Sequence, residues 1–409
     1  MPTATVVLLG TLDTKGHEYA YLAERVREQG VDCLLVDAGV FEPQVDADVS
    51  RHEVAAAAGA DADALATAGD RGAAVSAMAQ GAAEVVRRLH AEGRLDGIAS
   101  VGGSGNSSIA GIAMRGLPVG VPKLIVSTVA SGDTRPYVGA TDVTMTYSVV
   151  DIAGINQISA QILTNAAGAI AGMVKAEQPP LVESKPLVTA SMFGVTTPCV
   201  TRARERLEAL GYEVLVFHAT GTGGRSMEAL VAGGFLAGVL DVTTTELADE
   251  LVGGVLSAGP DRLEVAGRYG VPQVVSLGAL DMVNFGPRET VPPRFESRNL
   301  YVHNPTVTLM RTTPEECLEL GRTIGRKLSA AAGPTALFVP LRGVSMIAVE
   351  GQPFHDPEAD EALRAGLAET LDPSVEVHER DEDVNDPAFA TAMADRLHEL
   401  VGARAGAPA

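Results

Sequence analysis

The sequence predicts an α/β protein of two domains, each built on an open parallel sheet, with a ligand cleft between the domains. Three observations predict this fold: the length of 409 residues, short apolar runs that alternate with helix-like segments, and a repeat of that scheme in the second half. A single hydrophobic core rarely extends beyond about 250 to 300 residues, so the length favours two domains. Strands that alternate with helical patterns are typical of parallel sheets.

The beginning of the chain predicts a β–α–β unit. TVVLLG is a β-branched apolar run, HEYAYLAERVREQG has Tyr21, Leu22 and Val26 at helical spacing and stops at Gly30, and VDCLLVDAG is again a strand. The crossover is expected to be right-handed. LDGIASV and KLIVSTV continue the sheet as nearly continuous apolar runs, which is typical of strands covered on both faces.

A proline-rich break, KAEQPPLVESKP, separates two similar halves. After it, PLVTASMFGVTTPCVTRARERLEALGYEVLVFHATG repeats the order of strand, loop, helix, stop glycine and strand. We therefore expect two Rossmann-like domains, residues 1–180 and 185–402, followed by a disordered tail over residues 403–409. In such sheets the ligand crevice lies at the carboxyl ends of the strands.

Charge and cysteine content exclude several classes of protein. The net charge of −21 argues against nucleic-acid binding, and residues 350–399 account for −12 of it, with fifteen acids against three arginines. The rest is only mildly acidic, so a small anionic ligand remains compatible with it. The isolated Cys33, Cys199 and Cys317 favour a reduced, cytoplasmic compartment without disulfides or zinc. The longest apolar helical stretch, residues 152–174, is too polar to span a membrane.

The strongest candidate ligand loop is SVGGSGNSSIAG, between a predicted strand and a predicted helix. Its glycines let the backbone approach an anion, and the helix start offers unpaired amides and the positive end of the helix dipole. The alternative is a tight turn in which Ser107 or Ser108 caps the helix. The residues predicted to bind the ligand here are Gly102, Gly103, Ser104, Gly105, Asn106 and Ser107.

Two other loops lie at the same predicted edge. GTLDTKG contributes Thr11, Asp13, Thr14 and Lys15, but its spacing does not match the Walker A P-loop. Asp37 ends the second strand, where it could hold a ribose hydroxyl or simply form an Asp-Ala-Gly turn. The loop STVASGDTRPY adds Thr128, Ser131, Gly132 and Asp133. Asp133, or alternatively Asp13, could hold Mg²⁺ against phosphate oxygens, although Asp133 could also belong to a solvated Asx turn.

The second domain has its own polar candidates. Glu246 and Asp281 are the candidate general bases, and Arg311 or Arg342 could bind a carboxylate bidentately. His303, before Asn-Pro, could be a turn residue or an acid/base. The remaining predicted substrate-binding residues are Gly223, Gly224, Thr243, Thr244 and Asn284. No HExxH or GxSxG motif is present, which argues against zinc hydrolase and serine-triad chemistry.

Eight motifs occur in order along the chain: LLGTLDTKGHE, GGSGNSS, STVASGDT, GTGGRSMEALV, GVLDVTTTELADEL, GALDMVNFG, HNPTVTLMRTT and PFHDPEAD. Together they resemble the family of the plant tobamovirus resistance protein, which has uncharacterised two-domain bacterial members. The resemblance covers nearly the whole chain. It implies an N-terminal domain that binds ATP through residues 11–15, 102–107 and 131–133, a second α/β domain, and a homodimer or higher oligomer. It implies no settled reaction.

Our leading hypothesis is an ATP-dependent transferase or ligase that uses Mg²⁺. It would transfer a phosphoryl or adenylyl group to a small carboxylate or carbonyl metabolite at the cleft between the domains. One alternative is a nucleotide-sensing module that does not turn ATP over. Another is an ATP-independent lyase or isomerase in the second domain. No membrane or nucleic-acid partner is expected.

Overall fold

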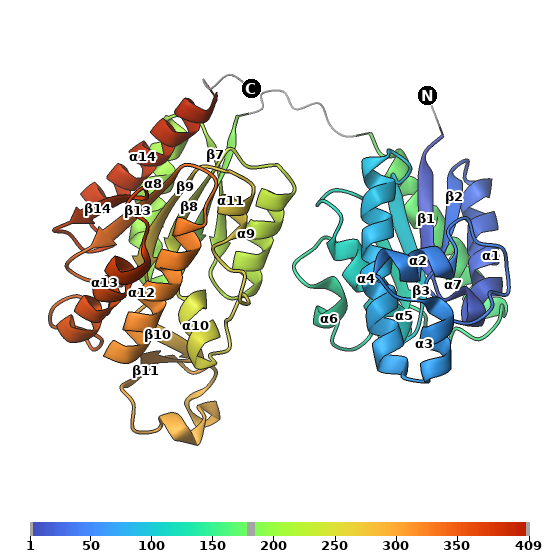
Figure 1. Ribbon diagram of the computed structural model, residues 1–409, viewed down its shortest axis with the longest axis horizontal. Coiled ribbons are helices and arrows are strands. Elements are labelled where there is room, and N and C mark those ends of the chain that lie inside the picture. Colours follow the sequence, from blue (N-terminus) through green and yellow to red (C-terminus); the bar gives the residue numbers. More distant parts are fainter. Residues whose placement is uncertain (1–2, 178–184, 406–409) are drawn as a thin grey trace. The chain divides into compact units, whose positions relative to one another are not determined.

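The structure, a computed structural model, describes residues 3–177 and 185–405 (Figure 1). The chain divides into two compact units, residues 1–180 (unit 1) and 181–409 (unit 2). Each unit contains a parallel β-sheet, which confirms the predicted α/β fold class. Most of the proposed linker and the last four residues of the tail, 406–409, lie outside the described residues.

Unit 1 contains a five-stranded sheet in the order β2-β1-β3-β4-β5, and all of its pairings are parallel. Its strands are β1 (Thr5–Gly10), β2 (Asp32–Asp37), β3 (Gly97–Gly102), β4 (Lys123–Ser127) and β5 (Thr144–Tyr147). Its helices are α1 (Leu12–Glu28), α2 (Arg51–Ala57), α3 (Ala62–Ala68), α4 (Arg71–Ala91), α5 (Ser104–Arg115), α6 (Arg135–Val138) and α7 (Gln157–Lys175).

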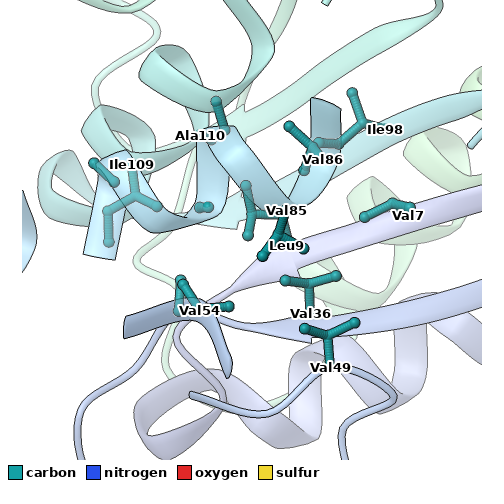
Figure 2. Packing of buried hydrophobic residues seen from close by; sticks show 14 of the residues in the cluster. Val7, Leu9, Val36, Val49, Val54, Val85, Val86, Ile98, Ile109 and Ala110 are labelled. Carbon is teal, nitrogen blue, oxygen red and sulfur yellow. The ribbon is translucent and has the colours of Figure 1, made fainter. Parts of the chain in front are cut away.

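Side-chain alternation along β1 divides the core of unit 1 between the two faces of the sheet. Val7 and Leu9 point to the face covered by α2, α4 and α5, where they meet Val54 and Val85 (Figure 2). The intervening Leu8 belongs to the cluster on the other face, which α1 and α7 cover. An uninterrupted apolar run is the pattern expected of a strand that, like β1, is buried on both faces.

Unit 2 contains a six-stranded parallel sheet in the order β14-β13-β9-β8-β6-β7 and a three-stranded antiparallel sheet in the order β10-β12-β11. The parallel strands are β6 (Leu187–Met192), β7 (Glu213–His218), β8 (Gly238–Thr243), β9 (Gln273–Gly278), β13 (Thr335–Pro340) and β14 (Glu376–Arg380). The antiparallel strands are β10 (Met282–Phe285), β11 (Leu300–Asn304) and β12 (Val307–Arg311).

The helices of unit 2 also cover both faces of its larger sheet. The cluster that contains α8 and α14 includes Val274 and Phe338, whereas the cluster with α12 and α13 includes the adjacent Val275 and Leu337. The helices are α8 (Thr197–Ala209), α9 (Thr222–Ala232), α10 (Glu246–Val252), α11 (Val265–Arg268), α12 (Pro314–Ser329), α13 (Pro357–Thr370) and α14 (Pro387–Ala405), with short 3₁₀ turns η1 (Gly194–Thr196), η2 (Arg288–Thr290) and η3 (Pro293–Phe295).

Two features differ from the expectation. The antiparallel sheet of unit 2 was not predicted, and α14 continues to Ala405, past the proposed start of the tail at residue 403. All three cysteines, Cys33, Cys199 and Cys317, are buried and free. No helix in the described part of the chain combines the length and the apolar composition that crossing a membrane requires.

Candidate functional site

The main candidate site is a cavity of about 520 Å³ in unit 1, at the carboxyl ends of the strands. β1 and β3 are neighbours there, but the helices that follow them cover opposite faces of the sheet, which opens a crevice between the two loops. The cavity brings together eight of the predicted residues: Thr11, Asp13, Thr14, Lys15, Gly103, Ser104, Gly105 and Asn106.

The start of α5 forms one side of this cavity. Its N-cap is Gly103, and no side chain caps the helix. Ser107 instead shares a hydrogen bond with the hydroxyl of Ser127 at 2.7 Å, and Ser108 donates to the carbonyl of Ser104, so neither serine has the capping role considered above. The first amides of α5 are therefore free for a ligand in the cavity.

The glycines around α5 have different roles. A Cβ on Gly102 would lie 2.7 Å from the Cβ of Asn106, so this glycine permits close packing. A Cβ on Gly103 or Gly105 would have no neighbour closer than 3.6 Å, so these two leave open space beside the helix start. The nearest atoms would be Thr128 Oγ1 for Gly103 and Arg71 Nη2, at 3.7 Å, for Gly105.

Asn106 fixes the loop through the hydrogen bonds of its side-chain amide. Its Nδ2 donates to Ser100 Oγ at 2.8 Å and to the carbonyl of Val101 at 2.9 Å, and also to the hydroxyl of the buried Tyr19 at 3.2 Å. Burial raises the pKa of Tyr19, which keeps its hydroxyl protonated. The Oδ1 atom of Asn106 is buried and has no partner among the described residues, although the residue lines the cavity.

Two carboxylates hold the loop after β2 against the start of α1. Asp37 Oδ1 accepts hydrogen bonds from the amides of Leu12 (3.0 Å) and Gly39 (2.8 Å), and Asp13 Oδ2 accepts from Val40 (3.2 Å) and Phe41 (3.1 Å). Asp13 Oδ1 and Asp37 Oδ2 are both buried and unpartnered within the described ranges. Burial raises the pKa of Asp37, and the nearby charge of Asp13 raises it further. Asp37 itself is not one of the residues that line the cavity.

Lys15 is less available to bind a ligand than its place in the loop suggested. The backbone of α1 departs from helical geometry at this residue, with φ −128° and ψ 17°. Its ammonium donates a hydrogen bond to the carbonyl of Ile152, which ties the segment before α7 to the first loop. The neighbouring Asp151 also lines the cavity.

Sequence reasoning missed an apolar wall on the other side of the cavity. It comes from the loop after β2 and from α3, α4 and α5, and its residues are Val40, Phe41, Leu65, Ala66, Ala74, Val75, Met78 and Ile109. The alanine-rich residues 54–91 are typical of helices, but their sequence does not indicate which side of each helix faces the cavity. The missed polar residues are Asp70, Arg71 and Asp151. An arginine at a helix start near the predicted sheet edge is the only sequence signal that could have pointed to Arg71.

The third predicted loop does not line this cavity. Asp133 forms a two-pronged ion pair with Arg135, at 2.9 Å to Nε and 2.7 Å to Nη2, on an exposed loop. These hydrogen bonds lower the pKa of Asp133 to about 2. Thr128 lies near Gly103, but Ser131 and Gly132 are not among the lining residues.

In unit 2, the predicted general base Glu246 is fully buried and engaged. Its Oε1 accepts hydrogen bonds from the amides of Gly221 (2.6 Å) and Gly224 (3.1 Å), and its Oε2 accepts from Arg262 Nε at 2.6 Å. The glycine loop of unit 2 thus holds a carboxylate of its own chain. A Cβ on Gly224 would lie 2.1 Å from Glu246 Oε2, so the close approach requires glycine.

Arg262 connects this carboxylate to the sheet. Its guanidinium, which is fully buried, donates to Asp241 Oδ2 at 2.5 Å and to Oδ1 at 2.7 Å. Glu228 lies 3.8 Å from the same guanidinium. Burial raises the pKa of Glu228 to about 7 despite this cation.

Asp281 and Arg311 form a second buried group. Asp281 Oδ2 accepts from Ser345 Oγ at 2.8 Å, while its Oδ1 lacks a partner in the described structure. Burial raises the pKa of Asp281 to about 6, and the charge of Arg311 opposes this shift. Arg311 donates to the carbonyl of Phe354 at 2.8 Å and to Asp360 Oδ1 at 2.9 Å.

The other predicted residues of unit 2 are each held by separate contacts. Thr243 and Thr244 are buried, the first bonded to Thr196 Oγ1 at 2.7 Å and the second to the carbonyl of Ser276 at 3.1 Å. Asn284 donates to Asp249 Oδ2 at 2.6 Å. Gly223 packs against the carbonyl of His218, and His303 is exposed on β11.

A second cavity, of about 470 Å³, lies beside the end of β13. Of the predicted residues only Arg342 lines it; Arg311 lies behind Asp360. The lining residues are Leu341, Arg342, Val349, Glu350, His355, Pro357, Asp360, Arg364 and Asp383. Across residues 3–177 and 185–405, no group of three or more His, Cys, Asp or Glu side chains is arranged to hold a metal ion.

Comparisons with solved structures give only distant likenesses. UDP-N-acetylglucosamine 2-epimerase from Rickettsia bellii is 10% identical with a TM-score of 0.22, and the match covers 66% of this chain and 78% of that one. MurG from Acinetobacter baumannii is 12% identical with a TM-score of 0.22, over 99% and 96% of the two chains.

Comparisons of sequence are far stronger. The N-terminal and C-terminal domain models of the uncharacterised protein family UPF0261 match residues 4–179 and 185–401. A UPF0261 protein of Clostridium tetani is 54% identical over 97% of this chain and 98% of its own length. The ToMV resistance protein Tm-1(GCR237) of Solanum lycopersicum is 40% identical over 97% of this chain and 55% of its own length, so this chain spans about half of that protein. The chain belongs to the UPF0261 family.

Proposed function

We propose that unit 1 binds Mg-ATP in the 520 Å³ cavity, and that the protein is an ATP-dependent transferase or ligase acting on a small carboxylate or carbonyl metabolite. The observation that carries the proposal is the uncapped start of α5, which opens into that cavity. Pockets for small molecules typically have volumes of about 300–1,000 Å³.

The polar side of the cavity suits a polyphosphate. The first amides of α5 have no side-chain cap, and no acidic side chain occupies the first turn of this helix. Amides at a helix start, together with the helix dipole, favour an anion. Gly103 and Gly105 leave room for phosphate oxygens to approach the backbone.

The opposite side suits a nucleobase. Val75, Met78 and Ile109 supply an apolar surface, and Phe41 lies on the loop after β2 with 59% of its surface exposed. An aromatic ring that is not packed into a core is available for stacking on a base. Asp37, at the end of β2, is in the position that holds ribose hydroxyls in dinucleotide folds, but it is not among the residues that line the cavity.

Magnesium fits the acidic residues of the cavity. Mg²⁺ is usually held by one or two carboxylates together with substrate phosphates, and it neutralises phosphate charge when bound. Asp13, whose Oδ1 is unpartnered, and Asp151 would hold it. Of the two residues proposed from sequence, Asp13 lines the cavity, whereas Asp133 is paired with Arg135 and is not among the lining residues.

The acceptor substrate would bind in the 470 Å³ cavity of unit 2. Arg342 and Arg364 supply guanidinium groups for a carboxylate. Arg342 forms an ion pair with Asp381. Both side chains are exposed to solvent, so this pair holds the arginine only weakly. His355 could exchange a proton with a bound substrate.

The test is a calorimetric titration of the full chain with Mg-ATP. The variant Gly103→Val adds a side chain at the start of α5, and its backbone at φ −88° accepts any residue. Gly168→Val on the exposed side of α7, where nothing lies within 4 Å, is the matched control. We expect binding that is lost in Gly103→Val and kept in Gly168→Val; absence of binding to the unmodified chain would contradict the proposal.

Turnover is tested separately. Incubating the protein with Mg-ATP and pooled carboxylate metabolites should yield ADP or AMP. If ATP binds but neither product forms, the result favours a nucleotide sensor. If a metabolite is converted without ATP, unit 2 acts as a lyase or isomerase.

A further inference from the structure

The two units share one topology, so their helix starts can be compared. Five strands of each sheet follow the same order: β2-β1-β3-β4-β5 in unit 1 corresponds to β7-β6-β8-β9-β13 in unit 2. The helix before the third strand is α4 in unit 1 and α9 in unit 2, and the helix after it begins with α5 and α10 respectively. All four helix starts lie at the carboxyl end of their sheet.

In unit 2 the space between these helix starts is filled from within. Glu246, the first residue of α10, reaches the amides of Gly221 and Gly224 at the start of α9. Arg262 neutralises that carboxylate from the other side, at 2.6 Å. The fold therefore brings an anion, backbone amides and one guanidinium together at this place.

In unit 1 the same space is part of the open cavity. Arg71 is the first residue of α4, and its Nη2 lies 3.7 Å from the position of a Cβ on Gly105, at the start of α5. Within the described residues, its guanidinium forms no ion pair and no hydrogen bond. Unit 1 thus places a guanidinium from the start of α4 beside the uncapped start of α5.

The second cation of the cavity is not equivalent to Arg71. Lys15 and Arg71 are the only basic residues that line the cavity within the described structure. The ammonium of Lys15 already donates to the carbonyl of Ile152. Arg71 is exposed, and its planar guanidinium can donate two parallel hydrogen bonds to a phosphate.

We infer that Arg71 is the phosphate-binding cation of unit 1, with the role toward a phosphate that Arg262 has toward the Glu246 carboxylate in unit 2. The inference rests on the proposed function, since it names the residue that recognises the phosphates of the nucleotide. It also gives the site its specificity: Arg71 would distinguish a nucleotide from its nucleoside.

The experiment compares ATP with adenosine by calorimetry on the full chain. Arg71→Ala should weaken ATP binding by about 10- to 100-fold, because a hydrogen-bonded charge pair is lost, and should leave adenosine binding unchanged within about twofold. Arg71→Lys should recover part of the lost ATP affinity, because lysine keeps the positive charge but lacks the two parallel N–H donors of the guanidinium. Arg87→Ala on the same helix, which removes an exposed ion pair with Glu84, should bind ATP as the unmodified chain does.

The outcomes separate the two proposals. If the unmodified chain binds neither ligand, the proposed function fails and this inference falls with it. If ATP binds equally to the unmodified chain and to Arg71→Ala, the inference alone is wrong. If Arg71→Ala loses ATP and adenosine to the same extent, Arg71 supports the shape of the cavity and does not recognise phosphate.

Discussion

Glu246 and Arg262 share a hydrogen bond of 2.6 Å at a place in unit 2 where neither side chain is exposed. Together with the amides of Gly221 and Gly224, they seal the start of α9. In unit 1, by contrast, the start of α5 has no side-chain cap and lines the 520 Å³ cavity.

The sealed position predicts a large loss of stability in Glu246→Ala. Removing the carboxylate leaves the Arg262 Nε and two amides unpaired, and breaking a buried ion pair typically costs about 3–5 kcal/mol. Hydrogen–deuterium exchange of peptides within residues 213–270 should accelerate. Glu205→Ala, at a half-exposed ion pair with Arg202, is the control and should change little; equal protection in both variants would contradict this role of Glu246.

The same contrast predicts a stoichiometry of one nucleotide per chain. Unit 1 offers an open helix start, whereas the glycine loop of unit 2 is occupied by Glu246. Calorimetric titration with Mg-ATP should therefore saturate at one equivalent. Saturation at two equivalents would mean that unit 2 admits nucleotide despite its internal carboxylate.

Phe41 is predicted to contact the base. Phe41→Ala should weaken ATP and adenosine binding by a similar factor, because stacking on a base is worth about 1–3 kcal/mol and does not involve phosphate. Since 59% of Phe41 is exposed, thermal stability should change little. Phe235→Ala in unit 2, where Phe235 is 43% exposed, is the control for losing a surface aromatic ring; a nucleotide affinity that does not respond to Phe41→Ala would place the base elsewhere.

The buried carboxyl of Asp281 predicts a pH dependence of stability. Its pKa is raised from 3.8 to about 6 in the folded protein, so the folded state binds more protons than the unfolded state between these values. Stability from this group is therefore full below about pH 4 and is lost as the pH rises to about 6, by about 3 kcal/mol in total.

Asp281→Asn tests this dependence. The amide keeps an oxygen for Ser345 but does not ionise. In urea unfolding followed by circular dichroism from pH 4 to 7, the unmodified chain should lose stability relative to the variant as the pH rises. Parallel curves would show that Asp281 does not titrate in this range.

The sequence predicted much of the fold because the physical signals are local. Uninterrupted apolar runs such as β1 identify strands buried on both faces, and parallel strands bring Thr11 and Gly103 to the same edge. The hairpin of β11 and β12 was missed because its turn, between Asn304 and Val307, contains proline and lacks a glycine signal.

The site was only partly predictable because its remaining residues depend on tertiary contacts. Asp133 pairs with Arg135 two residues along, and Glu246 meets a loop more than twenty residues earlier, so neither is available to a ligand as its motif suggested. Arg71 and Phe41 belong to no motif, and only the packing of α4 and the loop after β2 brings them to the cavity.

The most direct test of the account is a crystal structure of the full chain grown with magnesium and a non-hydrolysable ATP analogue. We predict phosphate oxygens within hydrogen-bonding distance of the first amides of α5 and of the Arg71 guanidinium, with the base against Phe41. Nucleotide bound at another place, or a cavity without nucleotide at saturating analogue, would contradict the central claim.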